Sequence, residues 1–402
     1  MWLLLAAAAA GLGACKWTEF DDLQDQTWVD STNKPGGVKS SDYGIAVARG
    51  AVSGTGGGRI VVIGAGVATY SELVYDATGS AKFPGTQLDL EMQYGIPNIG
   101  QPVLIADPTT DDISLIVGSD NGIAMLTGAS GALKLYQLFN QDKPDAATYM
   151  LAPTQTKELP MVAVGDSVLG ALLPALPMGG AQPICKLGDS ATPGFMAQIK
   201  ALAAVRVAPA PTDDVLAWDA GGKLYKYPGT VFNGCATAAE PLGSVDTTFK
   251  PDDGSLILSI DATHVILAGS NADGGFLQEY DAATLTAIGP AAMVPGLRTA
   301  ALLKVDTQQY VVAGVPTELV NGKSVGQVKL FPIEADGLGT TQVAAYNDAQ
   351  PDDNQSFGRG VAVMPFNGKQ VIVAAANNEI FAYFRANLAD GSVLYDETRQ
   401  GR

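Results

Sequence analysis

The chain contains a single histidine, His264, in 402 residues. This excludes His-rich zinc sites, two-histidine iron sites and mechanisms that need two imidazoles. Lys and Arg are also scarce, 24 against 41 Asp and Glu, and the net charge of −17 argues against a nucleic-acid partner, because phosphate backbones bind basic surfaces. Charged residues make up only 16% and apolar residues 47%. Such a chain is too apolar to be disordered and must bury a sizeable core.

The N-terminus opens with an apolar, small-residue run over residues 2–14. It is too short to span a bilayer as a helix and is typical of the hydrophobic region of a signal peptide. The run ends in Leu12, Gly13, Ala14 and Cys15. This ending resembles the lipobox of bacterial lipoproteins, although no Lys or Arg precedes the run. The resemblance implies a signal peptide over 1–14 and a lipid such as palmitate on Cys15; an ordinary secretory signal is the alternative.

The chain has three cysteines. With Cys15 acylated, Cys185 and Cys235 remain as an even pair in an oxidising compartment, and we predict a disulfide between them. Two buried free thiols are the alternative. Residues 15–41 are polar and contain Pro35, Gly36 and Gly37, so the lipidated cysteine is expected to lead into a flexible tether, with the globular part over 42–402.

Short β-branched runs that end in a small residue recur along the chain. Seven are found, at 59–64, 113–118, 160–165, 214–219, 264–269, 309–314 and 370–375, of which 214–219 is a degenerate member that ends in Asp219. The first and last ends are 311 positions apart over six intervals, about 52 residues each, and such a period is typical of repeat proteins. Apolar segments precede the runs, as at 43–48 and 299–305, and others follow them, as at 223–227, 276–280 and 328–331.

Three or four short strands per repeat, without amphipathic helices, predict an all-β fold. Seven repeats predict one seven-bladed β-propeller after the signal peptide and tether. The first and second strands of each blade are expected to lie inside, and the alternating third and fourth strands to face outward. A β-sandwich or a two-domain β protein is the alternative.

Several stretches are similar to the FG-GAP repeat of the integrin-α N-terminal β-propeller, in which Phe-Gly-x-x-Val-Ala is followed by Leu-x-Val-Gly-Ala-Pro and later by Gly-x-Val-x-x-Phe. They are 43–48 with 61–66, 312–316 with 326–331, and 357–362. In that family the loop between the first two strands binds calcium. Here the first such loop, 50–58, has no carboxylate, and the last turn is 365–368. Calcium needs six to eight oxygen ligands, and the acidic runs 107–112 and 246–253 lack the spacing, so no metal or other cofactor is predicted.

A second resemblance is to the quinoprotein-like repeat of an outer-membrane assembly lipoprotein and of quinone dehydrogenases, whose strands end in a Tyr-Asp-Ala-x-Thr-Gly turn. Similar turns occur at 75–79, 127–131, 218–222 and 280–284. Asp and Gly suit tight hairpins on physical grounds alone, so these turns favour propeller blades more than one family. The adjacent cysteine pair of the dehydrogenases is absent, which argues against a bound quinone.

Few residues indicate catalysis. His264 opens an apolar strand and is expected to be structural or at the surface. Residues 322–324 (Gly-Lys-Ser) lack the upstream glycine and the helix of a phosphate-binding loop, and 165–169 lacks the final glycine of a nucleophile elbow. A glycosidase needs two carboxylates across one cleft. The pairs available are Asp111 with Asp112, Asp213 with Asp214, Asp252 with Asp253, and Asp352 with Asp353.

Such neighbouring carboxylates are expected to be solvated turn residues, and their charge would attract cationic partners and repel polyanions. Trp17, Trp28 and Trp218 are too scattered to suggest a sugar platform. The sequence therefore predicts a non-enzymatic lipoprotein of the cell envelope, in the outer membrane on its periplasmic face or at the cell surface, with a protein- or glycan-binding propeller. A scaffold or assembly subunit of an outer-membrane complex and, less favoured, a carbohydrate-active enzyme are the alternatives.

Overall fold

The computed structural model describes the strands of the whole chain and a nearly continuous C-terminal half. The described residues are 28–33, 45–50, 58–64, 69–75, 81–82, 88–95, 103–106, 112–119, 122–129, 134–139, 149–152, 161–164, 168–172, 184–188, 199–205, 214–228, 241–252, 254–270, 274–347, 356–366, 369–377, 379–383 and 398–399. Side chains are described chiefly between 199 and 377.

The described chain is all-β, with one five-residue helix, α3 (Leu90–Tyr94). The first sheet contains β2 (Ile45–Gly50), β3 (Gly58–Gly64), β4 (Thr69–Tyr75), β5 (Ala81–Lys82) and β6 (Leu88–Asp89). The second contains β7 (Val103–Ala106), β8 (Asp112–Ser119), β9 (Gly122–Ala129) and β10 (Lys134–Phe139). The third contains β11 (Tyr149–Ala152), β12 (Met161–Val164), β13 (Val168–Leu172) and β14 (Ile184–Gly188).

The second half of the chain repeats this order. The fourth sheet, called sheet 4, contains β15 (Ile199–Val205), β16 (Asp214–Asp219), β17 (Lys223–Tyr227) and β18 (Gly243–Asp246). Sheet 5 contains β19 (Leu256–Ser259), β20 (His264–Gly269), β21 (Phe276–Asp281) and β22 (Thr286–Met293). Sheet 6 contains β23 (Thr299–Val305), β24 (Gln308–Val315), β27 (Gln327–Glu334), β28 (Gly337–Leu338) and β29 (Ala344–Tyr346). A small hairpin of β25 (Leu319–Val320) and β26 (Lys323–Ser324) is inserted between β24 and β27.

The last sheet joins the two ends of the chain. It contains β30 (Gly360–Phe366), β31 (Lys369–Ala375), β32 (Glu379–Tyr383), β1 (Trp28–Asn33) and β33 (Thr398–Arg399). Strand β1 pairs antiparallel with β32, Val29 opposite Tyr383. Part of the segment expected to be a tether, Trp28–Asn33, is therefore a strand of this sheet.

All seven recurring runs lie on the second strands of the sheets: β3, β8, β12, β16, β20, β24 and β31. The segments expected before and after them are first and third strands, for example β23 and β17. The second strands whose side chains are described, β16, β20, β24 and most of β31, are buried along most of their length; in β16 every residue is buried. A strand that another sheet covers on each face has no solvent side, which explains the continuous apolar runs.

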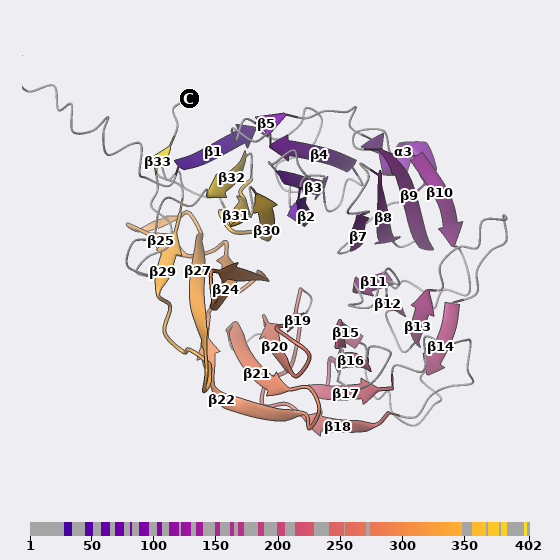
Figure 1. Cartoon of the computed structure of the whole chain (residues 1–402), viewed down its shortest axis with the longest axis vertical. Helices are drawn as coiled ribbons and strands as arrows, with labels where there is room; N and C mark the ends of the chain where they lie inside the picture. The colour runs from indigo at the N-terminus through magenta and orange to yellow at the C-terminus, as the bar shows by residue number, and fades with distance from the viewer. Residues whose placement is uncertain are drawn as a thin grey trace, which may run out of the picture.

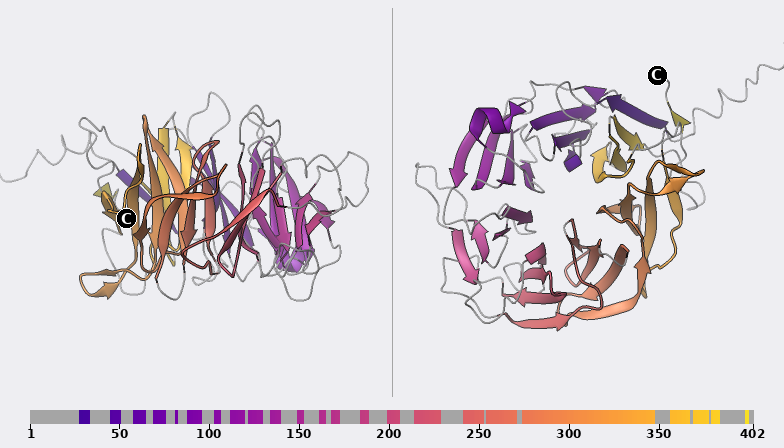
Figure 2. Two further views of the ribbon diagram at one scale, coloured as in Figure 1. Left: turned by 90° about the horizontal axis from the view of Figure 1, so that it is seen from below. Right: turned by 180° about the vertical axis from the view of Figure 1, so that it is seen from behind.

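The sheets follow one another around a common centre (Figure 1 and Figure 2, right). Neighbouring sheets touch through their inner strands: β2 contacts β7, β8 contacts β11, β11 contacts β15, β15 contacts β19, β19 contacts β23, β23 contacts β30, and β30 contacts β2. Each sheet by itself is open and, apart from the parallel pair β1–β33, antiparallel. Because β1 belongs to the sheet of β30–β32, the N-terminal and C-terminal parts of the chain are held together.

Apolar side chains fill the spaces between successive sheets. One cluster between sheets 4 and 5 includes Trp218 and Phe276, and a second, between sheets 5 and 6, includes Leu277 and Val311. A third, around Phe357, joins sheet 6 to the last sheet. Among the described residues, no helix is long and apolar enough to cross a membrane.

Candidate functional site

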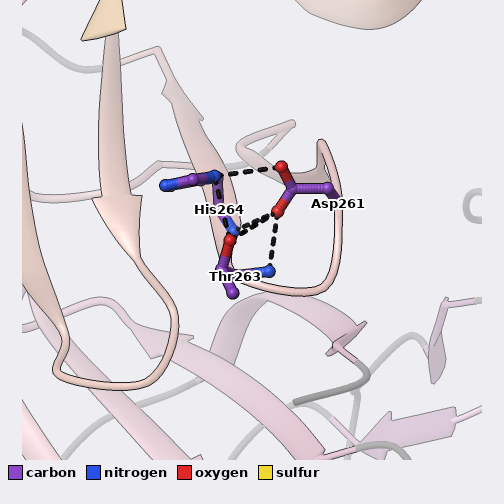
Figure 3. Close-up of polar contacts among 3 residues, drawn as sticks. All are labelled: Asp261, Thr263 and His264. Carbon is purple, nitrogen blue, oxygen red and sulfur yellow. Dashed lines mark hydrogen bonds and ion pairs between the residues drawn. The ribbon is translucent and has the colours of Figure 1, made fainter. Parts of the chain in front are cut away.

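A polar cluster lies where the loop after β19 enters β20, at one end of the contact between sheets 5 and 6. Asp261 organises the loop: its Oδ1 accepts hydrogen bonds from the backbone N–H groups of Thr263 (2.7 Å) and His264 (2.8 Å) and from the Thr263 hydroxyl (2.9 Å). Its Oδ2 lies 3.0 Å from His264 Nδ1 (Figure 3). A short polar side chain that bonds to the next backbone amides closes a tight turn, and this turn fixes the imidazole beside the carboxylate.

Asp261 and His264 shift each other's pKa. The hydrogen bond to Asp261 raises the pKa of His264, against a smaller opposing effect of desolvation. Burial acts to raise the pKa of Asp261, but hydrogen bonds from His264 and Thr263 outweigh it and hold the pKa below its ordinary value. The His264 side chain is 38% exposed. It is a half-exposed residue with a structural partner, as expected.

Glu279 is the unusual member of this neighbourhood. It pairs across the sheet with Ile266, as Asp281 pairs with His264, so all four side chains lie on the same face of sheet 5. Glu279 is only 4% exposed, and its Oε2 is buried without a hydrogen-bond partner. Burial raises the pKa of Glu279, while the His264 charge and a hydrogen bond from the Leu338 backbone act to lower it.

The third strand of sheet 5 departs from the sequence expectation. Alternation along β21 predicted an outward-facing strand, but five of its six residues are buried. Both faces of β21 are covered by neighbouring sheets, since Phe276 and Tyr280 belong to the cluster between sheets 4 and 5 and Leu277 to the cluster between sheets 5 and 6. Its pairing with β22 is irregular between Leu277 and Glu279, where the Gln278 amide donates to the carbonyls of Ile288 (3.0 Å) and Gly289 (3.1 Å). Strand β28 of sheet 6 contacts both β22 and β21. The burial of these polar residues depends on the neighbouring sheet and has no local signal in the sequence.

Two of the quinoprotein-like turns are described in detail, and in both the aspartate is structural. Asp281 Oδ1 accepts hydrogen bonds from the backbone N–H groups of Ala283 (2.8 Å) and Thr284 (2.7 Å). Asp219, 1% exposed, accepts from the Lys223 amide (2.8 Å) and from the Tyr225 hydroxyl (3.1 Å). These carboxylates hold the ends of β21 and β16, as the hairpin interpretation predicts.

The other sequence candidates that the structure describes form no metal site or phosphate loop. In the part of the chain that the structure describes, no three His, Cys, Asp or Glu side chains could hold a metal ion. Asp252 closes a turn with Ser255, whereas Asp111, Asp213, Asp253 and the pair at 352–353 lie outside the described residues. Trp218 is fully buried, so it offers no sugar platform. Residues 322–324 belong to the β25–β26 hairpin, with positive φ at Asn321 and Gly322, and form no phosphate loop.

The predicted lipidation and disulfide remain predictions. Cys15 and Cys235 lie outside the described residues, and Cys185 lies in β14, where only the backbone is described. The calcium-loop positions 51–57 and 367–368 also lie outside the described part.

Comparison with known proteins adds no family: no protein-family model and no curated protein matches the chain.

Proposed function

We propose that this chain is a bacterial cell-envelope lipoprotein, anchored through Cys15, whose sheets are the blades of a seven-bladed propeller related to FG-GAP repeats. The propeller is a non-catalytic platform that binds a protein or a glycan, in the outer membrane on the periplasmic face or at the cell surface. One observation carries the proposal: the seven sheets touch in cyclic order, and β1 pairs with β32. A ring closed by its own termini holds many loops on a rigid base, and loops on a rigid scaffold are where binding residues concentrate.

Three of the described carboxylates are engaged in turns of the fold itself. Asp219, Asp261 and Asp281 each accept hydrogen bonds that close a turn, so their immediate task is structural. The net charge of −17 favours a partner that presents cationic groups.

The position of β1 also supports an anchored platform. Twelve residues separate Cys15 from Trp28, and twelve residues of fully extended chain span about 40 Å. A lipid on Cys15 would therefore keep the sheet of β30–β32 and β1 within roughly that distance of the membrane surface.

Fractionation of cells that express the full chain tests the anchor. Cys15→Ala should move the protein from the membrane fraction to the soluble fraction and abolish incorporation of a palmitate analogue. Cys185→Ala, a matched loss of one cysteine, should leave the membrane association and the label incorporation unchanged. A Cys15→Ala protein that stays in the membrane fraction and still takes up the label would refute the lipoprotein proposal.

Protease treatment of intact and permeabilised cells then separates the partner classes. Digestion of intact cells favours capture of an extracellular ligand. Protection until permeabilisation favours a periplasmic assembly role.

A further inference from the structure

The only histidine of the chain shares a sheet face with a buried carboxylate that has one oxygen without a partner. Glu279 Oε2 has no hydrogen-bond partner and no exposure, while the Leu338 amide of the neighbouring sheet donates to the Glu279 carboxylate. His264 is the diagonal neighbour of Glu279 on this face, since it pairs with Asp281, two residues further along β21. Diagonal neighbours in an antiparallel pair are close enough for charges to interact.

From this arrangement we infer that the contact between sheets 5 and 6 is a pH-sensitive latch, in which Glu279 holds β28 against β21 at low pH and releases it as the pH rises. The inference concerns the described residues of these two sheets and does not depend on the proposed function.

The part that would move is small and weakly held. Strand β28 has two residues and pairs with β27 through only Ile333–Leu338 and Glu334–Gly337. The Leu338 side chain is 4% exposed and belongs to the apolar cluster between the two sheets. Gly337 lies close to the carboxylate: a Cβ at this position would be 3.7 Å from Glu279 Oε2. Elements with so few backbone pairings open locally before the protein unfolds.

Charged groups reach Glu279 from each packed element. The β19–β20 loop and β20 contribute Asp261 and His264, and β21 itself contributes Asp281. The β27–β28 hairpin carries two exposed carboxylates, Glu334 and Asp336. The β22 segment opposite Gln278 and Glu279, 288–291, has no titratable side chain. His264 is therefore the only cation among these groups.

The direction of the pH effect follows from the two raised pKa values. Burial raises the pKa of Glu279 above 4.5, so its contribution to the closed contact is complete below pH 4.5 and is lost as the pH rises through the folded pKa. The hydrogen bond to Asp261 raises the pKa of His264 above 6.5, so the imidazolium is present below pH 6.5 and is lost above its folded pKa. Both changes loosen the contact between β21 and β28 as the pH rises. The buried Glu279 carboxylate becomes charged, and His264 loses the positive charge that would stabilise it.

Amide hydrogen exchange of the full chain tests the latch, with rates corrected for the intrinsic effect of pH. We expect the protection of the Leu338 amide to fall as the pH rises above 4.5, by about tenfold for each unit by which the pKa of Glu279 is raised. E279Q should remove most of this pH dependence, because the side chain can no longer ionise. H264Q should leave protection unchanged at pH values where Glu279 is neutral, and should lower it where the ionised carboxylate faces the protonated imidazole in the wild type, so that the fall starts from a lower pH. E334Q, an exposed carboxylate of the same hairpin, is the matched control and should behave as the wild type.

Two results would overturn the latch. One is a wild-type Leu338 protection factor that is constant or rises between pH 4.5 and pH 8. The other is an E279Q protein that keeps the full pH dependence. If E279Q does not fold, the wild-type pH profile decides for the latch, and H264Q, at a half-exposed position that can be replaced without opening the core, decides for the histidine: protection equal to the wild type at every pH refutes its role.

Discussion

The aromatic contact between sheets 4 and 5 gives a quantitative test of how neighbouring sheets are held together. Trp218 on β16 and Phe276 on β21 are both buried, with ring centroids 5.7 Å apart and ring planes at 84°. Phe276 also stacks on Phe249, 4.4 Å between centroids. Edge-to-face pairs of this kind stabilise by about 0.5–1.5 kcal/mol beyond the area that they bury.

The perturbation is a double-mutant cycle of Trp218→Leu and Phe276→Leu. Truncation of a fully buried aromatic ring to Ala costs about 3–5 kcal/mol, and Leu retains part of the volume, so Trp218→Leu should cost about 2–3 kcal/mol and Phe276→Leu somewhat less. The indole Nε1 donates to the Thr247 hydroxyl (3.1 Å), whose single proton still has a carbonyl acceptor, Gly222 or Phe249, after the change. The double variant should therefore lose less than the sum of the two single losses, by about 0.5–1.5 kcal/mol.

Urea unfolding, followed by circular dichroism and by fluorescence, measures the three losses. Met293→Leu, at an exposed position of sheet 5, is the control and should change stability by less than about 0.5 kcal/mol. Single losses that add to within about 0.3 kcal/mol would refute the contact between the rings.

Two further predictions concern single residues. Gly326 has a φ of +89°, and a Cβ there would be 2.2 Å from the Phe357 carbonyl oxygen, whereas Gly322, with a φ of +80°, has no atom within 4 Å of such a Cβ. Gly322→Ala should therefore lower the free energy of unfolding by about 1–2 kcal/mol from backbone strain alone. Gly326→Ala should lower it further, because its Cβ also meets the Phe357 carbonyl. Equal losses of stability in thermal unfolding would contradict this steric clash. Asp281 has a lowered pKa because the Thr284 amide donates to its carboxylate, so its charge stabilises the fold above pH 3.8 and this contribution is lost as the pH falls. Asp281→Asn should lower the melting temperature more at pH 7 than at pH 3, and equal losses at both pH values would exclude that role for the charge.

The repeats and the strands that they contain were predictable from the sequence, because the signal is local. A strand covered on both faces needs an unbroken apolar run, and the run over 264–269 forms the fully paired strand β20. The tight turn at 280–284 was equally readable, since Asp281 bonds to the amides two and three residues later.

Long-range strand pairings and contacts between sheets were beyond sequence reasoning, because residues far apart in the chain make them. Within the last sheet, the pairing of β1 with β32 joins Trp28–Asn33 to Glu379–Tyr383, and a polar N-terminal segment showed no sign of it. The burial of Glu279 was equally unpredictable, because in the sequence it is a polar residue of an expected outer strand.

The sequence alone determined the all-β class, the repeat period and the strand positions, since these depend on side-chain alternation and turn residues within a few positions. Only the tertiary structure decided which polar residues are buried. Glu279 becomes a buried carboxylate because β28 of the next sheet contacts β21 and β22 there, and solvent exclusion of this kind depends on packing between sheets rather than on local sequence.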